Sequence, residues 1–159
     1  MKNIFLFIIF CLCSSTVFSQ NKEDIWSGTY VLKMHNDSNT VIDTLVIEQA
    51  PTLNKNDVAG KYEADLKRWT IYSKKDTKKD KQPIRRFLFN EENNEYEEFG
   101  WTTLHKNSSM DCIDGGHFFI CQTNQKGSLK IGNETFELTT NLFGIWLHYG
   151  LYDLEKISN

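Results

Sequence analysis

Hydrophobic and polar residues alternate with a period of two along most of this chain, the periodicity of a β-strand with one buried face. The clearest example runs from Trp26 to Met34, where every second residue is apolar or glycine. Residues 139–150 fit either a strand or a short helix packed over the end of a barrel. The alternation predicts strands over residues 26–34, 41–49, 58–66, 68–73, 84–90, 96–104, 117–123 and 151–157, and a hairpin over residues 129–138.

The hairpin is the best-defined local element. Its Gly132–Asn133 pair lies between alternating flanks, as a two-residue turn requires. Polar turns separate the other expected strands, and the sequence contains no internal repeat and no boundary between domains. About eight to ten short strands in one domain predict an all-β fold, either a single antiparallel β-barrel or a barrel-like sandwich.

The first 19 residues have the pattern of a secretory signal peptide. A short basic start at residues 1–3 precedes the apolar run Ile4–Leu12, and small residues Val17 and Ser19 stand before Gln20. Nine apolar residues are too few to span a bilayer, so we expect a cleaved leader and no stable membrane anchor. Residues 20–159 are then a single domain that is secreted or periplasmic.

The net charge of the chain limits the classes of partner that we expect. The formal net charge is -3, and loss of Lys2 with the leader makes it about -4, whereas general nucleic-acid binders are usually basic. Residues 74–81 contain five lysines and residues 91–98 contain five glutamates. These runs are either solvated turns that discourage edge pairing or a bipolar surface that orients a charged partner. We expect no nucleic-acid partner.

The two cysteines outside the leader are Cys112 and Cys121. Two cysteines in an exported domain most often pair, and this disulfide would pin the turn formed by Asp114, Gly115 and Gly116. A reactive or metal-binding thiol pair is the alternative, although eight intervening residues match no zinc pattern. The pinned turn is a candidate loop for binding a protein partner.

Motifs for catalysis, metals and cofactors are weak. Asp111, Asp114 and His117 have the residue types of a metal site, but they lack the spacing of a calcium loop. Residues 105–111, with the sequence HKNSSMD, contain the residue types of a hydrolase triad, but all on one loop, and no Gly-x-Ser-x-Gly elbow is present. Phosphate and dinucleotide fingerprints are also missing. We expect no metal, no cofactor and no enzymatic activity.

Aromatic residues fall mainly within the expected strands. A closed barrel of about eight strands either fills its interior with side chains or keeps a cavity for one small ligand. The sequence does not distinguish these cases. If a cavity exists, we expect an apolar or amphipathic small molecule to contact Tyr30, Trp69, Phe87, Trp101 and Phe119.

Residues 26–32, with the sequence WSGTYVL, resemble the first strand of the calycins, the lipocalin and fatty-acid-binding-protein group. Members of this group often open with two aromatic residues close to a glycine, followed by an apolar strand. Residues 150–157 resemble the last strand of small bacterial lipocalin-like domains, so the likeness covers about fifteen residues. Lipocalins proper place glycine before tryptophan, whereas here Trp26 precedes Gly28. The resemblance implies that Trp26 closes one end of a barrel and that the opposite mouth binds a ligand.

Two functions are therefore expected from the sequence. The first is a non-enzymatic secreted or periplasmic binding protein that holds a small apolar ligand in a barrel. The alternative is a periplasmic inhibitor or immunity protein that binds an enzyme through the charged turns and the disulfide-pinned loop.

Overall fold

The computed structural model describes residues 24–159, so the expected signal peptide lies outside the described residues. The strands are β1 (Gly28–Met34), β2 (Asp37–Ala50), β3 (Arg68–Ser73), β4 (Gln82–Arg86), β5 (Asp111–Asp114), β6 (Phe118–Gln122), β7 (Ser128–Ile131), β8 (Glu134–Glu137), β9 (Leu142–Trp146) and β10 (Gly150–Ser158). The helical segments are short: η1 (Lys55–Asp57), η2 (Gly60–Tyr62), α1 (Glu95–Glu98) and α2 (Thr102–Ser108).

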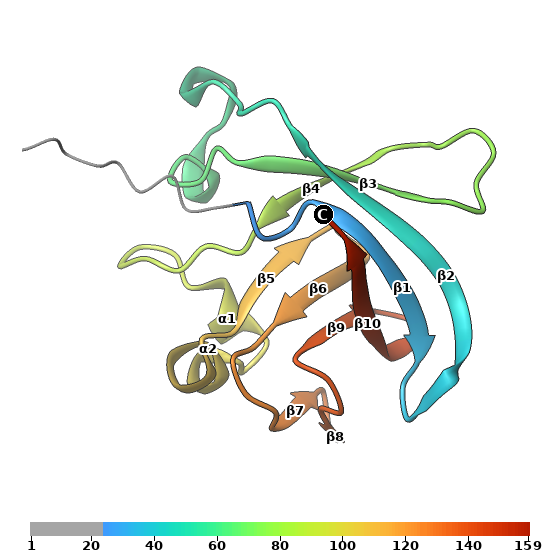
Figure 1. Ribbon diagram of the computed structural model, residues 1–159. Helices are drawn as coiled ribbons and strands as arrows, with labels where there is room; N and C mark the ends of the chain where they lie inside the picture. The colour runs from blue at the N-terminus through green and yellow to red at the C-terminus, as the bar shows by residue number, and fades with distance from the viewer. Residues whose placement is uncertain (1–23) are drawn as a thin grey trace, which may run out of the picture.

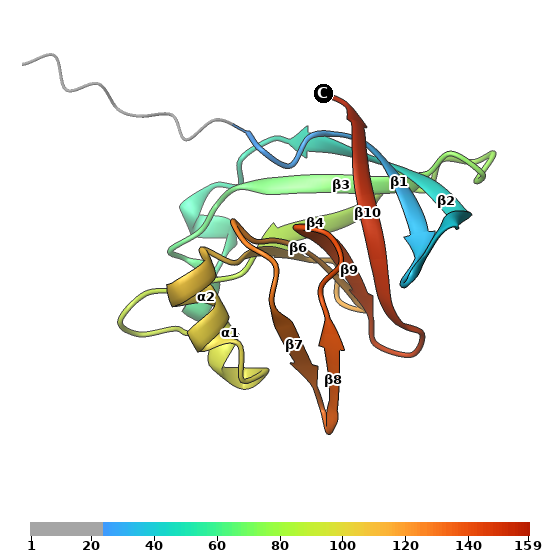
Figure 2. The same ribbon diagram turned by 60° about the horizontal axis from the view of Figure 1, so that its bottom comes forward.

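Eight of these strands form a closed antiparallel barrel in the order β1-β10-β9-β6-β5-β4-β3-β2 (Figure 1). The chain winds up and down around the barrel and closes where β10 pairs with β1, with Leu32 opposite Leu154. Strands β7 and β8 form a separate two-stranded sheet that projects from the barrel between β6 and β9 (Figure 2). The all-β barrel expected from the alternating pattern is therefore confirmed.

The barrel has two hydrophobic cores, one on each side of its wall. Strand β6 contributes to both, since Phe118 and Ile120 face inward while Phe119 and Cys121 face outward. The interior core consists of Trp26, Tyr30, Leu32, Leu45, Ile47, Trp69, Ile71, Ile84, Ile113, Phe118, Ile120 and Leu154. The outer core lies against α1, α2 and the β7–β8 hairpin and consists of Phe87, Tyr96, Trp101, Met110, Cys112, Phe119, Cys121, Leu129, Leu138, Phe143, Ile145 and Leu151.

Four loops mark one end of the barrel, which we call the mouth. Because neighbouring strands run antiparallel, the connections at residues 35–36, 74–81, 115–117 and 147–149 all emerge at this end. The opposite end, which we call the closed end, carries the start of β1 and the long segments at residues 51–67 and 87–110.

Side chains and the chain entry seal the closed end. Trp26 is almost fully buried, and the Tyr30 hydroxyl donates a 2.6 Å hydrogen bond to its carbonyl oxygen. The Trp69 indole N–H donates to the Asp24 carboxylate at 2.9 Å. Lys156 Nζ lies 5.7 Å from the centre of the Tyr30 ring. Trp26 thus lies at the end of the barrel opposite the mouth.

Two expected strands are wrong. Residues 96–104 form α1, α2 and their junction, because Gly100 adopts a φ of 70° and interrupts any extended run. Residues 58–66 form η2 and irregular chain around Gly60, whose φ is 66°. The segment at residues 139–150 proves to contain strand β9, and the hairpin over residues 129–138 is confirmed as β7 and β8.

Candidate functional site

A pocket of about 320 Å³ opens at the mouth of the barrel. Its buried wall includes Leu45 and Ile71 from β2 and β3, and the opposite wall is formed by Phe118 and Trp146 from β6 and β9. These strand pairs lie across the barrel from each other, so the pocket occupies the part of the barrel interior next to the mouth. The polar residues of the lining are Ser73, Asp76, Asp80 and Gln82, together with the hydroxyl-bearing Tyr72.

Trp146 is positioned by three neighbours. Its ring stacks on Phe118 with centroids 5.3 Å apart and an interplanar angle of 18°. Tyr152 meets the same ring edge-on at 5.3 Å. Gly144 provides the space behind it, since a Cβ at that position would lie 2.3 Å from Cζ3 of the indole. Trp146 is only partly buried and presents a fixed aromatic surface at the mouth.

The loop at residues 74–81 is an ordered turn. The Asp76 carboxylate accepts hydrogen bonds from the backbone N–H groups of Lys78 at 2.9 Å and Asp80 at 3.0 Å. These donors hold the pKa of Asp76 below its usual value, so the group is a carboxylate at neutral pH. A charged group is therefore held at the edge of the pocket.

The five aromatic residues expected to contact a ligand do not come together. Tyr30 and Trp69 belong to the interior core, near the closed end, where the Asp24 carboxylate holds Trp69. Phe87, Trp101 and Phe119 lie in the outer core, where Phe87 and Phe119 are 5.2 Å apart. The structure therefore places these three outside the barrel interior.

None of the nine residues that line the pocket was among the expected ligand contacts; its apolar walls are formed by Leu45, Ile71, Phe118 and Trp146. Phe118 and Phe119 are adjacent, so the sequence alone does not say which of them faces inward. Trp146 lies in residues 139–150, for which the sequence fits either a strand or a short helix. Gly144 was the usable signal, because a glycine inside a strand often marks a place where another group approaches the backbone closely.

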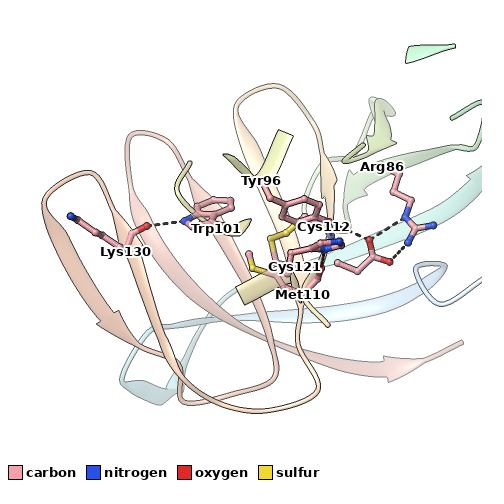
Figure 3. Close-up of a disulfide and its surroundings, with 9 residues drawn as sticks. Arg86, Tyr96, Trp101, Met110, Cys112, Cys121 and Lys130 are labelled. Carbon is pink, nitrogen blue, oxygen red and sulfur yellow. Dashed lines mark hydrogen bonds and ion pairs between the residues drawn. A yellow bond between two sulfur atoms is a disulfide. The ribbon is translucent and has the colours of Figure 1, made fainter. Parts of the chain in front are cut away.

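The disulfide between Cys112 and Cys121 is present, as expected. The two cysteines are directly opposite each other on β5 and β6, fully buried in the outer core (Figure 3). Their Cα atoms are 4.1 Å apart. The bond thus joins two strands that carry the β5–β6 loop toward the mouth.

That loop is held closely in place. The Gly115 N–H donates to the Phe118 carbonyl at 3.0 Å, and the Gly116 N–H donates to Asp114 Oδ1 at 2.6 Å. Arg85 Nη2 donates to the other Asp114 oxygen at 2.8 Å. A Cβ on Gly115 would lie 2.2 Å from the Phe118 ring, which explains the glycine. Of the expected partner-binding residues, Gly116 is exposed, whereas Asp114 is engaged by Arg85.

A buried ion-pair network fixes the segment at residues 87–110 to the barrel. Glu95 accepts hydrogen bonds from Arg85 Nη1 at 2.5 Å and from the Leu88 N–H at 2.9 Å, and Lys61 Nζ lies 3.0 Å away. Burial alone would raise the pKa of Glu95, but these donors outweigh it and hold the pKa below its usual value. The Tyr62 ring covers the Arg85 guanidinium at 4.3 Å.

Polar groups near the disulfide are also engaged within the fold (Figure 3). Arg86 Nε donates to Asp111 at 3.1 Å, and the Cys112 N–H donates to the Tyr96 hydroxyl at 3.1 Å. Burial, with help from the Asp111 carboxylate, raises the pKa of Tyr96. His105 Nδ1 lies 2.6 Å from the Met110 carbonyl and therefore donates its proton there.

These hydrogen bonds show how the triad-like residues of the segment 105–111 are arranged. His105 is bonded to a backbone carbonyl and Asp111 to Arg86, so the carboxylate does not orient the imidazole as in a catalytic triad. The same side chains border a hollow of about 540 Å³ near the closed end, beside Asp65 and Lys67. Its wall is formed in part by the Arg86–Asp111 ion pair, whose charges are satisfied within the fold.

Within residues 24–159, no cluster of three or more metal-ligating side chains is found. In the same range, no helix has the length and hydrophobicity needed to cross a membrane. Comparisons with protein-family models, curated proteins and solved structures find no match to this chain. The function must therefore be argued from the site itself.

Proposed function

We propose that this protein is an exported, non-enzymatic binding protein of calycin-like type that holds one small molecule at the mouth of its barrel. The observation that carries this proposal is the mouth pocket between Leu45 and Ile71 on one side and Phe118 and Trp146 on the other. Ligand sites are typically concave and mostly apolar, with a few polar groups that fix orientation. The mouth pocket has apolar side chains on its two facing walls and polar side chains, two of them aspartates, in the rest of its lining.

The size of the pocket restricts the ligand. About 320 Å³ lies at the lower end of the range of roughly 300–1,000 Å³ in which small-molecule pockets usually fall. Trp69, Ile84 and Tyr30 fill the barrel toward the closed end, so a long acyl chain has no space there. The proposed ligand is therefore a compact molecule with one or two rings that packs on Trp146.

Export is supported by two independent features. The first 19 residues read as a leader, and the disulfide requires an oxidising compartment to form and persist. We therefore propose that the protein acts in the periplasm or the extracellular medium.

A solvatochromic naphthalene dye, titrated into the mature protein, tests the proposal. We expect saturable binding of one dye per chain, with a dissociation constant of tens of micromolar. This value follows if about 12 heavy atoms of the dye each contribute roughly 0.5 kcal/mol to the binding free energy. Ser73→Phe places a ring in the pocket and abolishes this binding. Thr135→Phe adds the same ring to exposed strand β8 and leaves it unchanged. Equal binding by both variants, or no saturable binding by the wild type, would contradict the proposal.

A protein partner is the second candidate, favoured by one observation. The exposed side chains of Leu147 and Tyr149, at 48% and 77% exposure, lie next to the pinned β5–β6 loop, where the Leu147 N–H donates to the His117 carbonyl at 3.1 Å. Affinity purification with the wild type and with a Leu147→Ser, Tyr149→Ser double variant tests it. A partner retained by the wild type alone supports this function, and identical eluates argue against it.

A further inference from the structure

The β3–β4 loop at residues 74–81 separates its charges. It contains five lysines and two aspartates, so its overall charge is positive. Both aspartates line the mouth pocket, whereas none of its lysines does. The sign of the charge that a bound molecule meets is therefore opposite to the sign of the loop as a whole.

The contacts of the lysines explain this separation. Lys75 Nζ donates to the Ile42 carbonyl, and Lys81 pairs with Glu48. Lys79 and Lys81 each lie 5.8 Å from the centre of the Tyr72 ring. Glu48 and Tyr72 are neighbours across β2 and β3, so these contacts draw positive charge away from the interior. The remaining two, Lys74 and Lys78, are exposed and lie outside the pocket lining.

The aspartates and Gln82 supply acceptors at the pocket edge. Asp76 is fixed by two backbone donors, and its pKa is below its usual value. For the Asp80 carboxylate, no hydrogen-bond donor is found among residues 24–159 in this structure. Arginine, lysine and histidine do not occur among the described residues that line this pocket.

Resting on the function proposed above, we propose that the ligand is an apolar amine: a compact ring system bearing one positively charged ammonium group. The ring packs against Trp146 and Phe118, and the ammonium group lies at the edge near Asp76 and Asp80. The partly buried Trp146 indole lines the same pocket as the two carboxylates, and an aromatic ring also attracts a cation. The lysines of the loop stay outside the pocket lining, because Lys75 donates to the Ile42 carbonyl and Lys79 and Lys81 lie over the Tyr72 ring.

Three probes of matched size and shape test the charge preference: 2-naphthylmethylamine, 2-naphthylmethanol and 2-naphthoate. Calorimetric titration at pH 7 is expected to rank them in that order of affinity, with the amine about fivefold to tenfold tighter than the alcohol. Raising the salt concentration weakens binding of the amine and leaves binding of the alcohol unchanged.

Substitutions then locate the charge. Asp80→Asn removes the carboxylate that has no structural hydrogen bond, and we expect the amine to fall to the affinity of the alcohol. Asp80→Glu restores the charge and most of the preference. Glu134→Gln removes one negative charge from the exposed β7–β8 hairpin and serves as the matched control. Asp76→Asn gives the same direction of change, with a control thermal melt because it also loses turn hydrogen bonds.

The outcomes separate the two proposals. Equal affinities for amine and alcohol, or a preference for the carboxylate, overturn the amine assignment while leaving a mouth-binding function intact. The amine assignment also fails if Glu134→Gln weakens amine binding as much as Asp80→Asn does. If no probe binds and the solvatochromic dye also fails to bind, both proposals fall together.

Discussion

Substitution of Gly144 by alanine is the sharpest test of how the mouth is built. The added Cβ would lie 2.3 Å from Trp146 Cζ3 and 2.9 Å from Leu154 Cδ1. Carbon atoms in contact are normally about 3.5–4.0 Å apart, so the indole ring must move by about 1.2 Å or more. That movement disturbs the stack on Phe118 and the edge contact with Tyr152.

Overpacking of this kind costs about 1–3 kcal/mol. For a domain of this length, each kcal/mol corresponds to roughly 3–4 °C in the melting temperature, so we expect Tm to fall by about 3–12 °C. Calorimetry measures the shift, and the tryptophan emission spectrum reports the displaced ring, because Trp146 is the least buried of the described tryptophans. Dye affinity at the mouth falls in parallel.

Gly127→Ala provides the matched control. No atom lies within 4 Å of a Cβ at Gly127, and its backbone conformation is open to other residues. We expect this variant to melt within about 2 °C of the wild type, since substitutions away from packed groups usually change stability by less than about 0.5 kcal/mol. If Gly144→Ala behaves like Gly127→Ala in both stability and emission, the ring does not cover Gly144 and the described pocket wall is wrong.

Three further predictions concern the supports of the barrel. Replacing Cys112 and Cys121 by serine should lower the free energy of unfolding by about 2–3 kcal/mol, because the disulfide closes a short loop. This prediction is refuted if the wild-type protein unfolds at the same urea concentration in its reduced and oxidised forms. Glu95→Gln should cost about 1.5–3 kcal/mol at pH 7. Because the pKa of Glu95 is lowered in the folded state, its contribution is complete above about pH 4.5 and is lost as pH falls further, so the difference from wild type should narrow in acid melts. Tyr30→Phe removes the donor to the buried Trp26 carbonyl and should cost about 1–2 kcal/mol in denaturant titrations; an unchanged midpoint would exclude that bond.

The alternating pattern was sufficient to predict most of the barrel. Segments with one apolar face, such as residues 26–34 and 68–73, form strands close to the expected bounds. The Gly132–Asn133 turn placed the β7–β8 hairpin correctly, because the residue requirements of a two-residue turn are strict. The expected disulfide between Cys112 and Cys121 is also present.

The outer core could not be predicted from the alternating pattern of the sequence. In β6, Phe118, Phe119, Ile120 and Cys121 are all buried, so alternation disappears and the inward phase cannot be read. The covering elements include residues 96–104, whose aromatic residues suited a strand equally well. Tyr96 and Trp101 instead anchor short helices, because burial against the outer wall outweighs the intrinsic β preference of aromatic residues.

The candidate site was harder to predict than the fold. A mouth pocket depends on which side chains from distant strands meet across the barrel, and that follows from the closure of β1 on β10 and from register. Leu45 and Trp146 lie about a hundred residues apart and share no local pattern. The five lysines of residues 74–81 also indicated a positive loop, whereas its two aspartates are the residues that line the pocket.

The pairing of β1 with β10 has a consequence for engineering. Thr29 lies opposite Ser158, so the start of β1 and the end of β10 are neighbours at the closed end (Figure 1). Domains with adjacent ends usually tolerate circular permutation. A short linker between these ends, with new termini opened at an exposed mouth loop, should preserve the strand order while releasing one rim of the pocket. Conversely, a surface tether attached at the closed end beside Ser158 would display the mouth outward.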